Sequence, residues 1–480
     1  MDTVLEQRIV QRRARIAVLG LGYVGLPLAI QCAEGGFHVV GIDLDGCKVA
    51  ALNRGHSYVG DVPSIRVAPL VQSGRLCATT DYAAVDPVPD VVFICVPTPY
   101  TGAKVPDLSY IEAATEAIAA RLVPEQLIIL ESTTYPGTTE ELVQPLLERS
   151  GLRAARDFYL VFSPERINPG DRHFAVHNTP KVVGGTRRAA SHLASLLFAA
   201  IAPSGVFTVS SPRAAEMAKL LENTFRSVNI ALVNELALLA ERMGVDIWEV
   251  IDAASTKPFG FMRFTPGPGV GGHCIPVDPF YLSWKAREYD FYTRFIEHAA
   301  AINDGMPFHL RDLTAGALNR AGKTMRDARV LVLGVAFKPD VDDYRNSPAR
   351  RFIELLREEG ARVRYHDPHV PCFPVTDRIF AQETNGHALQ SVPLTEREVR
   401  ESDAVVIVTG HSGIDYRWVA EQAPLVVDAI NATRDYSGDR TKICRLGAPA
   451  CGSSSRQRGA YSSHDAVPLV QDRHEKQGVA

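Results

Sequence analysis

One short stretch near the start of the chain restricts the possible folds more than any other: Gly20-Leu-Gly22-Tyr-Val-Gly25. The residues just before it, 15–19, form a short apolar run that predicts a buried parallel strand, and a helical pattern follows it. A strand, a G-x-G-x-x-G turn and a helix in this order are typical of a dinucleotide-binding α/β unit. The glycines allow a tight turn, close approach of a pyrophosphate and close packing of helix on strand, and the helix N-terminus faces the phosphates.

The next predicted strand indicates which dinucleotide is bound. It covers residues 38–43 and ends in Asp43, which follows Gly25 by 18 residues. An acid at this point bonds the adenosine ribose hydroxyls and disfavours the extra phosphate of NADP, so we predict NAD. Two further strands, 91–96 and 127–131, lead into Thr98 and into Ser132-Thr133. Ligands bind at the carboxyl ends of strands in such sheets, which makes these residues cofactor or substrate candidates.

A second stretch, Pro266-Gly-Pro-Gly-Val-Gly-Gly-His-Cys-Ile-Pro-Val-Asp-Pro279, predicts a chemical site. Four glycines and four prolines in fourteen residues exclude regular helix or strand. The resulting fixed loop carries one thiol, Cys274, and one carboxylate, Asp278. Such a thiol can act as a covalent nucleophile if its surroundings favour the thiolate, whereas most lone cysteines are inert packing.

Residues 211–243 predict one long helix, with Ser211 and Pro212 as start signals and Gly244 as the stop. Its length suits a spine between domains and a homodimer face. Lys219 and Asn223 are four residues apart and therefore share one side of it. Helical sequence is expected again from Lys285 to about residue 320. A second α/β unit follows, with strands at 330–335, 361–365, 404–408 and 425–427, a helix at 347–359 and a charged loop at 337–347.

The predicted fold is therefore α/β: two Rossmann-like, doubly wound parallel-sheet domains joined by a long central helix. The expected boundaries are an NAD-binding domain at 1–210, a central helical and dimerisation region with the cysteine loop at 211–322, a substrate-binding α/β domain at 323–447 and a disordered tail at 448–480.

Composition excludes several other classes of function. A net charge of −4 leaves no basic footprint for nucleic acid or an anionic membrane. The eight cysteines are scattered without a C-x-x-C pair, which argues against a zinc site or a disulfide framework and for a reducing compartment. The N-terminus lacks an apolar signal core and no apolar run approaches twenty residues, so we expect a cytoplasmic enzyme without a metal.

Six ordered motifs show a family likeness. From about Arg15 to Thr433 the chain resembles the UDP-glucose/GDP-mannose dehydrogenase family, and within it most of all the bacterial UDP-N-acetylglucosamine 6-dehydrogenases. The motifs that carry the resemblance are Gly20–Gly25, Glu131-Ser-Thr133, Pro164-Glu165-Arg166, Lys219 with Asn223, Gly271-Gly-His-Cys274 with Asp278, and Phe337-Lys338 with Arg345.

The resemblance implies a four-electron oxidation of carbon 6 of a UDP-sugar, in which a primary alcohol becomes a carboxylate and two NAD⁺ are reduced. Cys274 would hold the aldehyde as a thiohemiacetal and then as a thioester. Lys219 and Asn223 would stabilise the developing oxyanion. Asp278 and a water on Thr133 would assist proton transfer, and Glu165 would serve thioester hydrolysis.

The resemblance also implies two sets of binding residues. The cofactor set comprises Gly20, Gly22, Tyr23, Val24, Gly25, Asp43, Lys48, Thr98, Ser132, Thr133 and Arg345. The substrate set comprises Glu165, Arg166, Asn168, Lys219, Asn223, Arg263, Phe264, Gly271 and Lys338.

Two departures from the family pattern keep the substrate open. Glucose-oxidising members carry a second glutamate where this chain has Pro169, which favours UDP-N-acetylglucosamine over UDP-glucose, and an arginine usual in the subgroup is missing from Asp428-Ala-Ile-Asn431. UDP-glucose and UDP-N-acetylmannosamine remain alternative substrates. A catalytically inactive nucleotide-sugar-binding protein is a further alternative. The joint presence of five residues argues against it: Cys274, Lys219, Asn223, Asp278 and Glu165.

Overall fold

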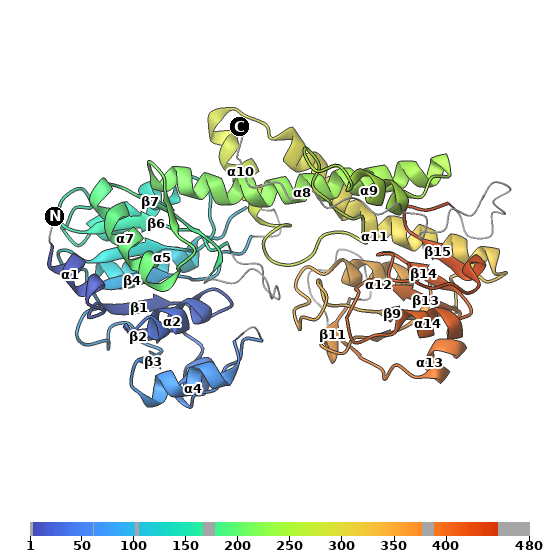
Figure 1. Cartoon of the computed structure of the whole chain (residues 1–480), viewed down its shortest axis with the longest axis horizontal. Helices are drawn as coiled ribbons and strands as arrows, with labels where there is room; N and C mark the ends of the chain where they lie inside the picture. Colours follow the sequence, from blue (N-terminus) through green and yellow to red (C-terminus); the bar gives the residue numbers. More distant parts are fainter. Residues whose placement is uncertain (1–2, 61, 101–104, 167–177, 377–387, 450–480) are drawn as a thin grey trace, which may run out of the picture.

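The computed structural model describes residues 3–60, 62–100, 105–166, 178–376 and 388–449. Two α/β lobes lie at the ends of one long helix (Figure 1). The predicted site residue Asn168 and almost all of the predicted tail lie outside the described residues.

The N-terminal lobe is built on an eight-stranded sheet in the order β3-β2-β1-β4-β5-β6-β7-β8. Its first six strands follow the Rossmann order, and they are parallel, as expected. The pair β6–β7 is antiparallel, which the sequence pattern did not indicate. The strands are β1 Arg15–Leu19, β2 His38–Ile42, β3 Leu76–Thr79, β4 Val91–Ile94, β5 Leu127–Leu130, β6 Tyr159–Phe162, β7 Lys181–Gly185 and β8 Val206–Thr208.

Helices cover both faces of this sheet because its central strands are apolar on both sides. In β1, Ile16 and Val18 pack with the helices of one face, whereas Ala17 and Leu19 pack with those of the other. The first face carries α1 Val4–Val10, α2 Gly25–Glu34, α4 Ser64–Gln72 and α7 Arg188–Ile201. The second carries α5 Ser109–Ala119, the π-helix η1 Thr139–Val143 and α6 Gln144–Glu148. The short α3, Gly46–Asn53, follows β2.

The C-terminal lobe repeats the plan on a smaller scale. Its five parallel strands have the order β10-β9-β13-β14-β15, the second common doubly wound arrangement. They are β9 Arg329–Leu333, β10 Arg362–His366, β13 Ala404–Ile407, β14 Val426–Asp428 and β15 Ile443–Arg445. Helix α12, Pro348–Glu358, packs on one face; α13 Glu396–Glu401 and α14 Tyr416–Gln422 pack on the other. A small antiparallel pair joins β11 Cys372–Pro374 to β12 Ala388–Gln390, and the 3-10 helix η4, Arg440–Lys442, precedes β15.

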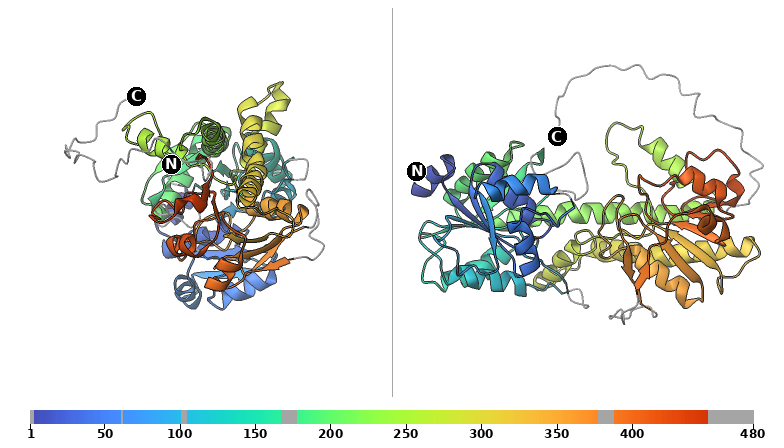
Figure 2. Two further views of the ribbon diagram at one scale, coloured as in Figure 1. Left: turned by 90° about the vertical axis from the view of Figure 1, so that its right-hand side faces the viewer. Right: turned by 90° about the horizontal axis from the view of Figure 1, so that it is seen from below.

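The connecting helix α8 covers Pro212–Met243, 32 residues, and so spans about 48 Å. Ser211 caps its start by accepting the Ala214 amide, and Gly244 ends it in the left-handed conformation. Figure 1 shows it reaching from the N-terminal sheet to the C-terminal lobe. The views in Figure 2 show α11, Arg294–Arg320, beside it, and α9, Ile247–Ala254, follows α8 in the chain.

The region expected to be helical from Lys285 to residue 320 is divided among three elements. The structure has α10 Asp278–Ala286, a 3-10 turn η3 Arg287–Tyr289 and then α11. Asp290 adopts a φ of 52° at the break, where a right-handed helix cannot continue.

The structure bears on two expectations, one about membrane-spanning helices and one about disulfides. Among the described residues, no helix has the length and apolarity needed to cross a bilayer. Among the described residues, six cysteines have free thiols and Cys444 is disulfide-bonded; a single bonded cysteine is not the disulfide framework that the cysteine spacing argues against.

Candidate active site at the junction of the lobes

The glycine turn after β1 forms a cradle of the shape that a pyrophosphate needs. Gly20 has a φ of 90°, and a Cβ there would lie 2.5 Å from the Cys95 carbonyl oxygen. A Cβ on Gly25 would lie 1.8 Å from the Gly20 oxygen, so α2 can approach β1 only without it. A Cβ on Gly22 would meet no heavy atom within 4 Å. The residues present therefore fit a dinucleotide, with open space at the central glycine and a helix N-terminus behind it.

Asp43, the predicted ribose ligand, lies just after β2 and beside the glycine turn. Its Oδ2 accepts the Leu21 amide at 2.9 Å, which ties it to the glycine turn. Lys48 Nζ lies 3.4 Å from the same oxygen. Two predicted cofactor residues, Asp43 and Lys48, are thus adjacent to the cradle.

The cysteine loop is fixed against the C-terminal lobe. The Gly272 amide donates to the Arg345 carbonyl at 2.9 Å, and Asn346 Nδ2 donates to the Gly272 carbonyl at 3.0 Å. A Cβ on Gly271 would lie 2.6 Å from the Phe337 Cβ, so only glycine allows this contact. The thiol is therefore carried at the junction of the two lobes.

A tight turn orients Cys274 and Asp278 together. The Cys274 carbonyl accepts the amides of Val277 and Asp278 at 3.0 and 2.8 Å, which starts α10 at Asp278. The thiol is half-buried. Burial raises the pKa of Cys274 to about 11, and the Asp278 carboxylate adds to this more than Lys219 offsets it. These surroundings favour the thiol rather than the thiolate, so this sulfur can act as a nucleophile only with the help of a base.

Asp278 has the properties of that base. It is buried, and Asn223 Nδ2 on α8 donates to its Oδ2 at 2.5 Å. Burial raises the pKa of Asp278 to about 6, although Lys219 and Asn223 act to lower it. At neutral pH an ionised carboxylate therefore lies beside a protonated thiol, which is the protonation state that proton transfer from sulfur requires.

Lys219, on the same side of α8 as Asn223, contacts Glu165. The buried Lys219 ammonium donates to the Glu165 carbonyl at 2.7 Å. The Glu165 carboxylate accepts from Lys181 Nζ at 2.8 Å and from the Arg166 amide at 2.7 Å. Arg166 itself pairs with Glu222 of α8 at 2.7 Å.

The tips of β4 and β5 carry three of the predicted cofactor residues, Thr98, Ser132 and Thr133. Ser132 Oγ donates to the Val96 carbonyl at 2.8 Å and so joins the two tips, with Thr133 half-buried beside it. The Tyr281 hydroxyl of α10 donates to the Thr98 carbonyl, which links this region to the cysteine loop.

Arg345 draws together three segments that are far apart in the chain. Its guanidinium lies over the Tyr23 ring at 5.0 Å, its Nη2 is 3.3 Å from His273 Nδ1, and it bonds Asp343. Burial and Arg345 together lower the pKa of His273 to about 4, so its imidazole is neutral at pH 7. A cleft of about 240 Å³ opens here between the lobes, lined by Tyr23, His273, Phe337 and the 340–343 segment.

Other predicted substrate residues are placed differently. Arg263 pairs with Asp252 of α9 at 2.7 Å, and the Phe264 ring packs edge-on against Phe225 of α8. Lys338 is half-buried in the loop after β9. The structure thus gives Arg263 and Phe264 partners on helices, and no described contact joins either to the cysteine loop.

Sequence reasoning missed two buried charged residues at the site. Lys181 is the first residue of β7, and it lies beside Glu165 because β7 runs antiparallel to β6. Glu216 of α8 accepts the amides of Gly137 and Thr139 at 2.5 and 2.9 Å, which anchors the segment after β5. A charged residue inside an apolar strand or helix face was the available signal.

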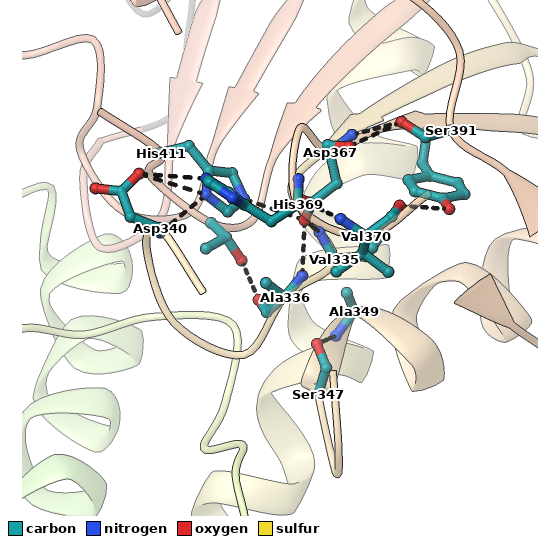
Figure 3. Close-up of polar contacts among 12 residues, drawn as sticks. Val335, Ala336, Asp340, Ser347, Ala349, Asp367, His369, Val370, Ser391 and His411 are labelled. Atoms are coloured by element: carbon teal, nitrogen blue, oxygen red, sulfur yellow. Dashed lines mark hydrogen bonds and ion pairs between the residues drawn. The ribbon is translucent and has the colours of Figure 1, made fainter. Parts of the chain in front are cut away.

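One side-chain group has the composition of a metal site: Asp340, His369 and His411, whose potential ligand atoms lie within 4.8 Å of one another (Figure 3). His411 Nδ1 accepts the Asp340 amide at 3.0 Å, and its Nε2 lies 3.1 Å from Asp367 Oδ2. Both ring nitrogens of His411 are therefore already engaged, which leaves no lone pair for an ion.

Asp367 connects His411 to the turn after β9 within the C-terminal lobe. It stands after the second strand of its sheet, as Asp43 does in the first lobe, and its Oδ2 accepts the Val335 and Ala336 amides at 2.8 and 2.9 Å. Burial opposes ionisation, but hydrogen bonds from His411 and these amides hold the pKa of Asp367 well below its usual range. In this lobe the acid after the second strand, Asp367, is therefore bonded to the backbone of the turn after β9.

The fold and this site define an oxidoreductase that binds a dinucleotide and presents a thiol at the lobe junction. Three family models match along the chain. The NAD binding domain of the UDP-glucose/GDP-mannose dehydrogenase family matches residues 14–202, its central domain 213–305 and its UDP binding domain 331–435. The chain belongs to the UDP-glucose/GDP-mannose dehydrogenase family, and it is an NAD-dependent nucleotide-sugar dehydrogenase.

Individual relatives agree with this assignment. A UDP-N-acetyl-D-mannosamine dehydrogenase of Pyrococcus horikoshii is 40% identical over 83% of this chain and 89% of its own length. A UDP-N-acetyl-D-glucosamine 6-dehydrogenase of Pseudomonas aeruginosa is 36% identical over 83% and 90%. The solved structure of the UDP-D-ManNAc dehydrogenase of Pyrococcus horikoshii superposes with a TM-score of 0.80 at 36% identity, covering 90% of this chain and 99% of the other.

We expect a strong preference for NAD⁺ over NADP⁺, because the Asp43 carboxylate repels a 2′-phosphate. Asp43→Asn keeps an acceptor for the Leu21 amide and removes the charge, so the ratio of kcat/KM for the two cofactors should shift toward NADP⁺ by at least about tenfold. Steady-state kinetics with each cofactor measure this ratio. Asp45→Asn removes a charge two residues away and is the matched control; equal shifts in both variants would show that Asp43 does not face the ribose.

Proposed function

We propose that the chain oxidises the C6 hydroxymethyl group of a UDP-N-acetylhexosamine to a carboxylate, with two NAD⁺ consumed and one water added per sugar. The single observation that carries the proposal is the buried arrangement around Cys274. Asn223 Nδ2 donates to Asp278 Oδ2 at 2.5 Å, and this carboxylate raises the pKa of the neighbouring Cys274 thiol. A simple alcohol dehydrogenase has no use for a nucleophile and base in this position.

NAD⁺, when bound in the cradle of Gly20–Gly25, would accept a hydride from C6 in each of the two oxidations, and the C6 hydroxyl proton released in the first goes to solvent. Between them, the Cys274 sulfur adds to the C6 aldehyde and its proton passes to Asp278. The aldehyde oxygen gains negative charge as the C–S bond forms. Lys219 and Asn223 stabilise that charge, and removal of one such donor typically costs about a hundredfold to a thousandfold in rate.

After the second oxidation C6 is a thioester of Cys274. A water oxygen then bonds to C6, one water proton passes to Glu165, and the C–S bond breaks. The sulfur regains a proton, the sugar leaves as a carboxylate, and the remaining proton goes to solvent. Glu165 suits this role because Lys181 and the Arg166 amide orient its carboxylate at hydrogen-bond distance.

Two sugars compete as the preferred substrate. The Pro164–Gly170 and Lys257–Phe264 sequences, with Pro169 in place of a second glutamate, support UDP-N-acetylglucosamine. The 40% identity to a UDP-N-acetyl-D-mannosamine dehydrogenase supports its C2 epimer as the second candidate. A site that bonds the N-acetyl amide leaves its own polar groups unpaired when glucose binds, so both should exceed UDP-glucose by tenfold or more, on the order of 1–3 kcal/mol.

The test is NADH formation with UDP-N-acetylglucosamine, UDP-N-acetylmannosamine, UDP-N-acetylgalactosamine, UDP-glucose and GDP-mannose under one set of conditions. We expect two NADH per sugar and the highest kcat/KM with UDP-N-acetylglucosamine. One NADH per sugar would refute the thioester route. A higher kcat/KM for UDP-glucose would refute the N-acetylhexosamine assignment while leaving the route through Cys274 intact.

A homodimer through α8 is part of the proposal. Leu232, Leu236 and Leu239 are 51%, 42% and 49% exposed, and they lie on one side of the helix, whereas Val233 is buried against the C-terminal lobe. Leu221, Phe225 and Met243 extend the same exposed apolar stripe. Apolar side chains repeated along one helix face are typical of a surface that another helix covers.

We expect sedimentation to give a dimer at micromolar concentration and Leu232→Asp/Leu236→Asp to give a monomer, because each change places a charge in the covered stripe. Ile65→Asp, an equally drastic change at an exposed apolar residue of α4, is the control and should remain dimeric. A monomeric wild-type chain would contradict the assignment of this stripe.

A further inference from the structure

Three charged side chains meet at the carboxyl edge of the N-terminal sheet: Glu165, and two residues that no expected role explains, Glu131 and Lys181. Glu131 follows β5, Glu165 follows β6 and Lys181 begins β7. Because β7 runs antiparallel to β6, with Val161 opposite Gly185, continuing that register places Lys181 opposite Glu165. Lys181 Nζ lies 2.8 Å from Glu165 Oε2 and 3.2 Å from Glu131 Oε1.

The cluster is buried and its charges do not balance. Lys181 is 2% exposed, Glu131 1% and Glu165 7%. One ammonium faces two carboxyl groups, so full ionisation would leave a net negative charge out of water, which is costly. Burial raises the pKa of the Glu131 carboxyl, more than Lys181 lowers it, and Glu165 raises it further. Burial therefore favours the neutral form of the Glu131 carboxyl.

The surroundings hold the cluster in place. The Lys181 ammonium lies 5.3 Å from the centre of the Phe198 ring of α7, and Cys95 Sγ is 3.8 Å from Glu131 Oε2. The thiols of Cys95 and Cys32 face the cluster, and burial raises the pKa of each, so they do not contribute charge near neutral pH. On the α8 side Lys219 bonds the Glu165 backbone carbonyl, while the Glu165 carboxylate accepts from Lys181 and from the Arg166 amide.

We propose that Lys181 is a positioning residue for thioester hydrolysis: it keeps Glu165 ionised and aimed, while Glu131 competes for the same ammonium and carries the cluster's exchangeable proton. This rests on the proposed function, in which Glu165 takes one proton from the attacking water. Lys181 touches neither substrate nor cofactor. Its ammonium favours the ionised form of Glu165, and the neutral form of Glu131 leaves that ammonium to Glu165 alone.

Two single substitutions have opposite expected effects. Lys181→Met removes the ammonium that favours the carboxylate form of Glu165. The acidic limb of the pH–rate profile for thioester hydrolysis should therefore move to higher pH by about one unit or more. At pH 7 the rate of hydrolysis should fall about tenfold to a hundredfold. Glu131→Gln removes the competitor, so the acidic limb should move down. Lys181→Arg keeps the charge and should restore most of the rate.

The readout is the decay of the Cys274 thioester in single turnovers with UDP-N-acetylglucosamine, or whichever panel sugar the wild type oxidises fastest, and NAD⁺. Acid quenching at several pH values and intact mass spectrometry follow the adduct. KM for NAD⁺ and formation of the first NADH should not change. Glu140→Gln, which removes a carboxylate that pairs with Arg213 outside the cluster, is the control for Glu131→Gln.

The outcomes separate the two proposals. Displacements of the acidic limb in opposite directions support the role of Lys181. If the wild type forms and hydrolyses the thioester but both variants displace the limb in one direction, or neither does, the role of Lys181 is refuted and the proposed function stands. A wild type that forms no thioester with any UDP-sugar overturns the proposed function first. If Lys181→Met does not fold, Glu131→Gln decides: an unchanged limb refutes the role.

Discussion

Cys274→Ser should abolish formation of the uronic acid, with a loss of at least about a thousandfold in the rate of the complete reaction, while a slow first oxidation survives. A hydroxyl fits the space of the thiol but is a poorer nucleophile and a poorer leaving group. The thiol already has its pKa raised to about 11 by burial, and a serine hydroxyl gives up its proton far less readily than a thiol. We therefore expect that Asp278 does not activate the serine hydroxyl.

The measurement is the yield of acid per sugar, with NADH counted in parallel. We expect at most one NADH per sugar from Cys274→Ser and two from the wild type. Cys372→Ser, at an exposed free thiol of the C-terminal lobe, is the matched control and should behave as the wild type. Wild-type acid yield from Cys274→Ser would remove the covalent route.

Asp278→Asn should lose about a hundredfold or more in the rate of the second oxidation and yet fold more stably. The loss follows because an amide cannot accept the thiol proton. In the wild type this step should speed up as pH rises through about 6, where Asp278 ionises, and the variant should lack that limb.

The stability gain follows from the sign of the same pKa shift. The folded-state pKa of Asp278 is raised from 3.8 to about 6, so the folded chain binds this proton more tightly than the unfolded chain. Stability from this group is complete below about pH 4 and is lost as pH rises through 6, at a cost of up to about 3 kcal/mol at neutral pH. Asparagine carries no such cost.

Denaturant unfolding at pH 5 and pH 7.5 measures the effect. The wild type should lose stability relative to Asp278→Asn between these values. Asp435→Asn, which removes an exposed carboxylate that pairs with Arg434, should show no such difference from the wild type. An Asp278→Asn variant less stable than wild type at pH 7.5 would show that the buried carboxylate is compensated by its neighbours.

Local sequence was enough to predict the features that depend on near neighbours. The cradle of Gly20–Gly25 is one strand, one turn and one helix, and its glycines reveal where a Cβ cannot fit. Lys219 and Asn223 share a side of α8 because helical geometry places residues four apart together. The fold class was predictable for the same reason, since apolar runs that alternate with helical patterns indicate parallel sheets.

Only the tertiary structure decided which residues from distant parts of the chain come into contact. Strand direction is not encoded in apolar periodicity, so the antiparallel β7 and the resulting contact of Lys181 with Glu165 could not be read from Lys181–Gly185. The break at Asp290 depends on one left-handed residue that helical patterning hides. The pKa of Asp278 is set by burial between α8 and α10, and Arg345 reaches Tyr23 and His273 only because the lobes close on the cysteine loop. Sequence determined which groups are present, whereas long-range packing determined their partners, because burial and the distance between side chains exist only once distant segments are brought together.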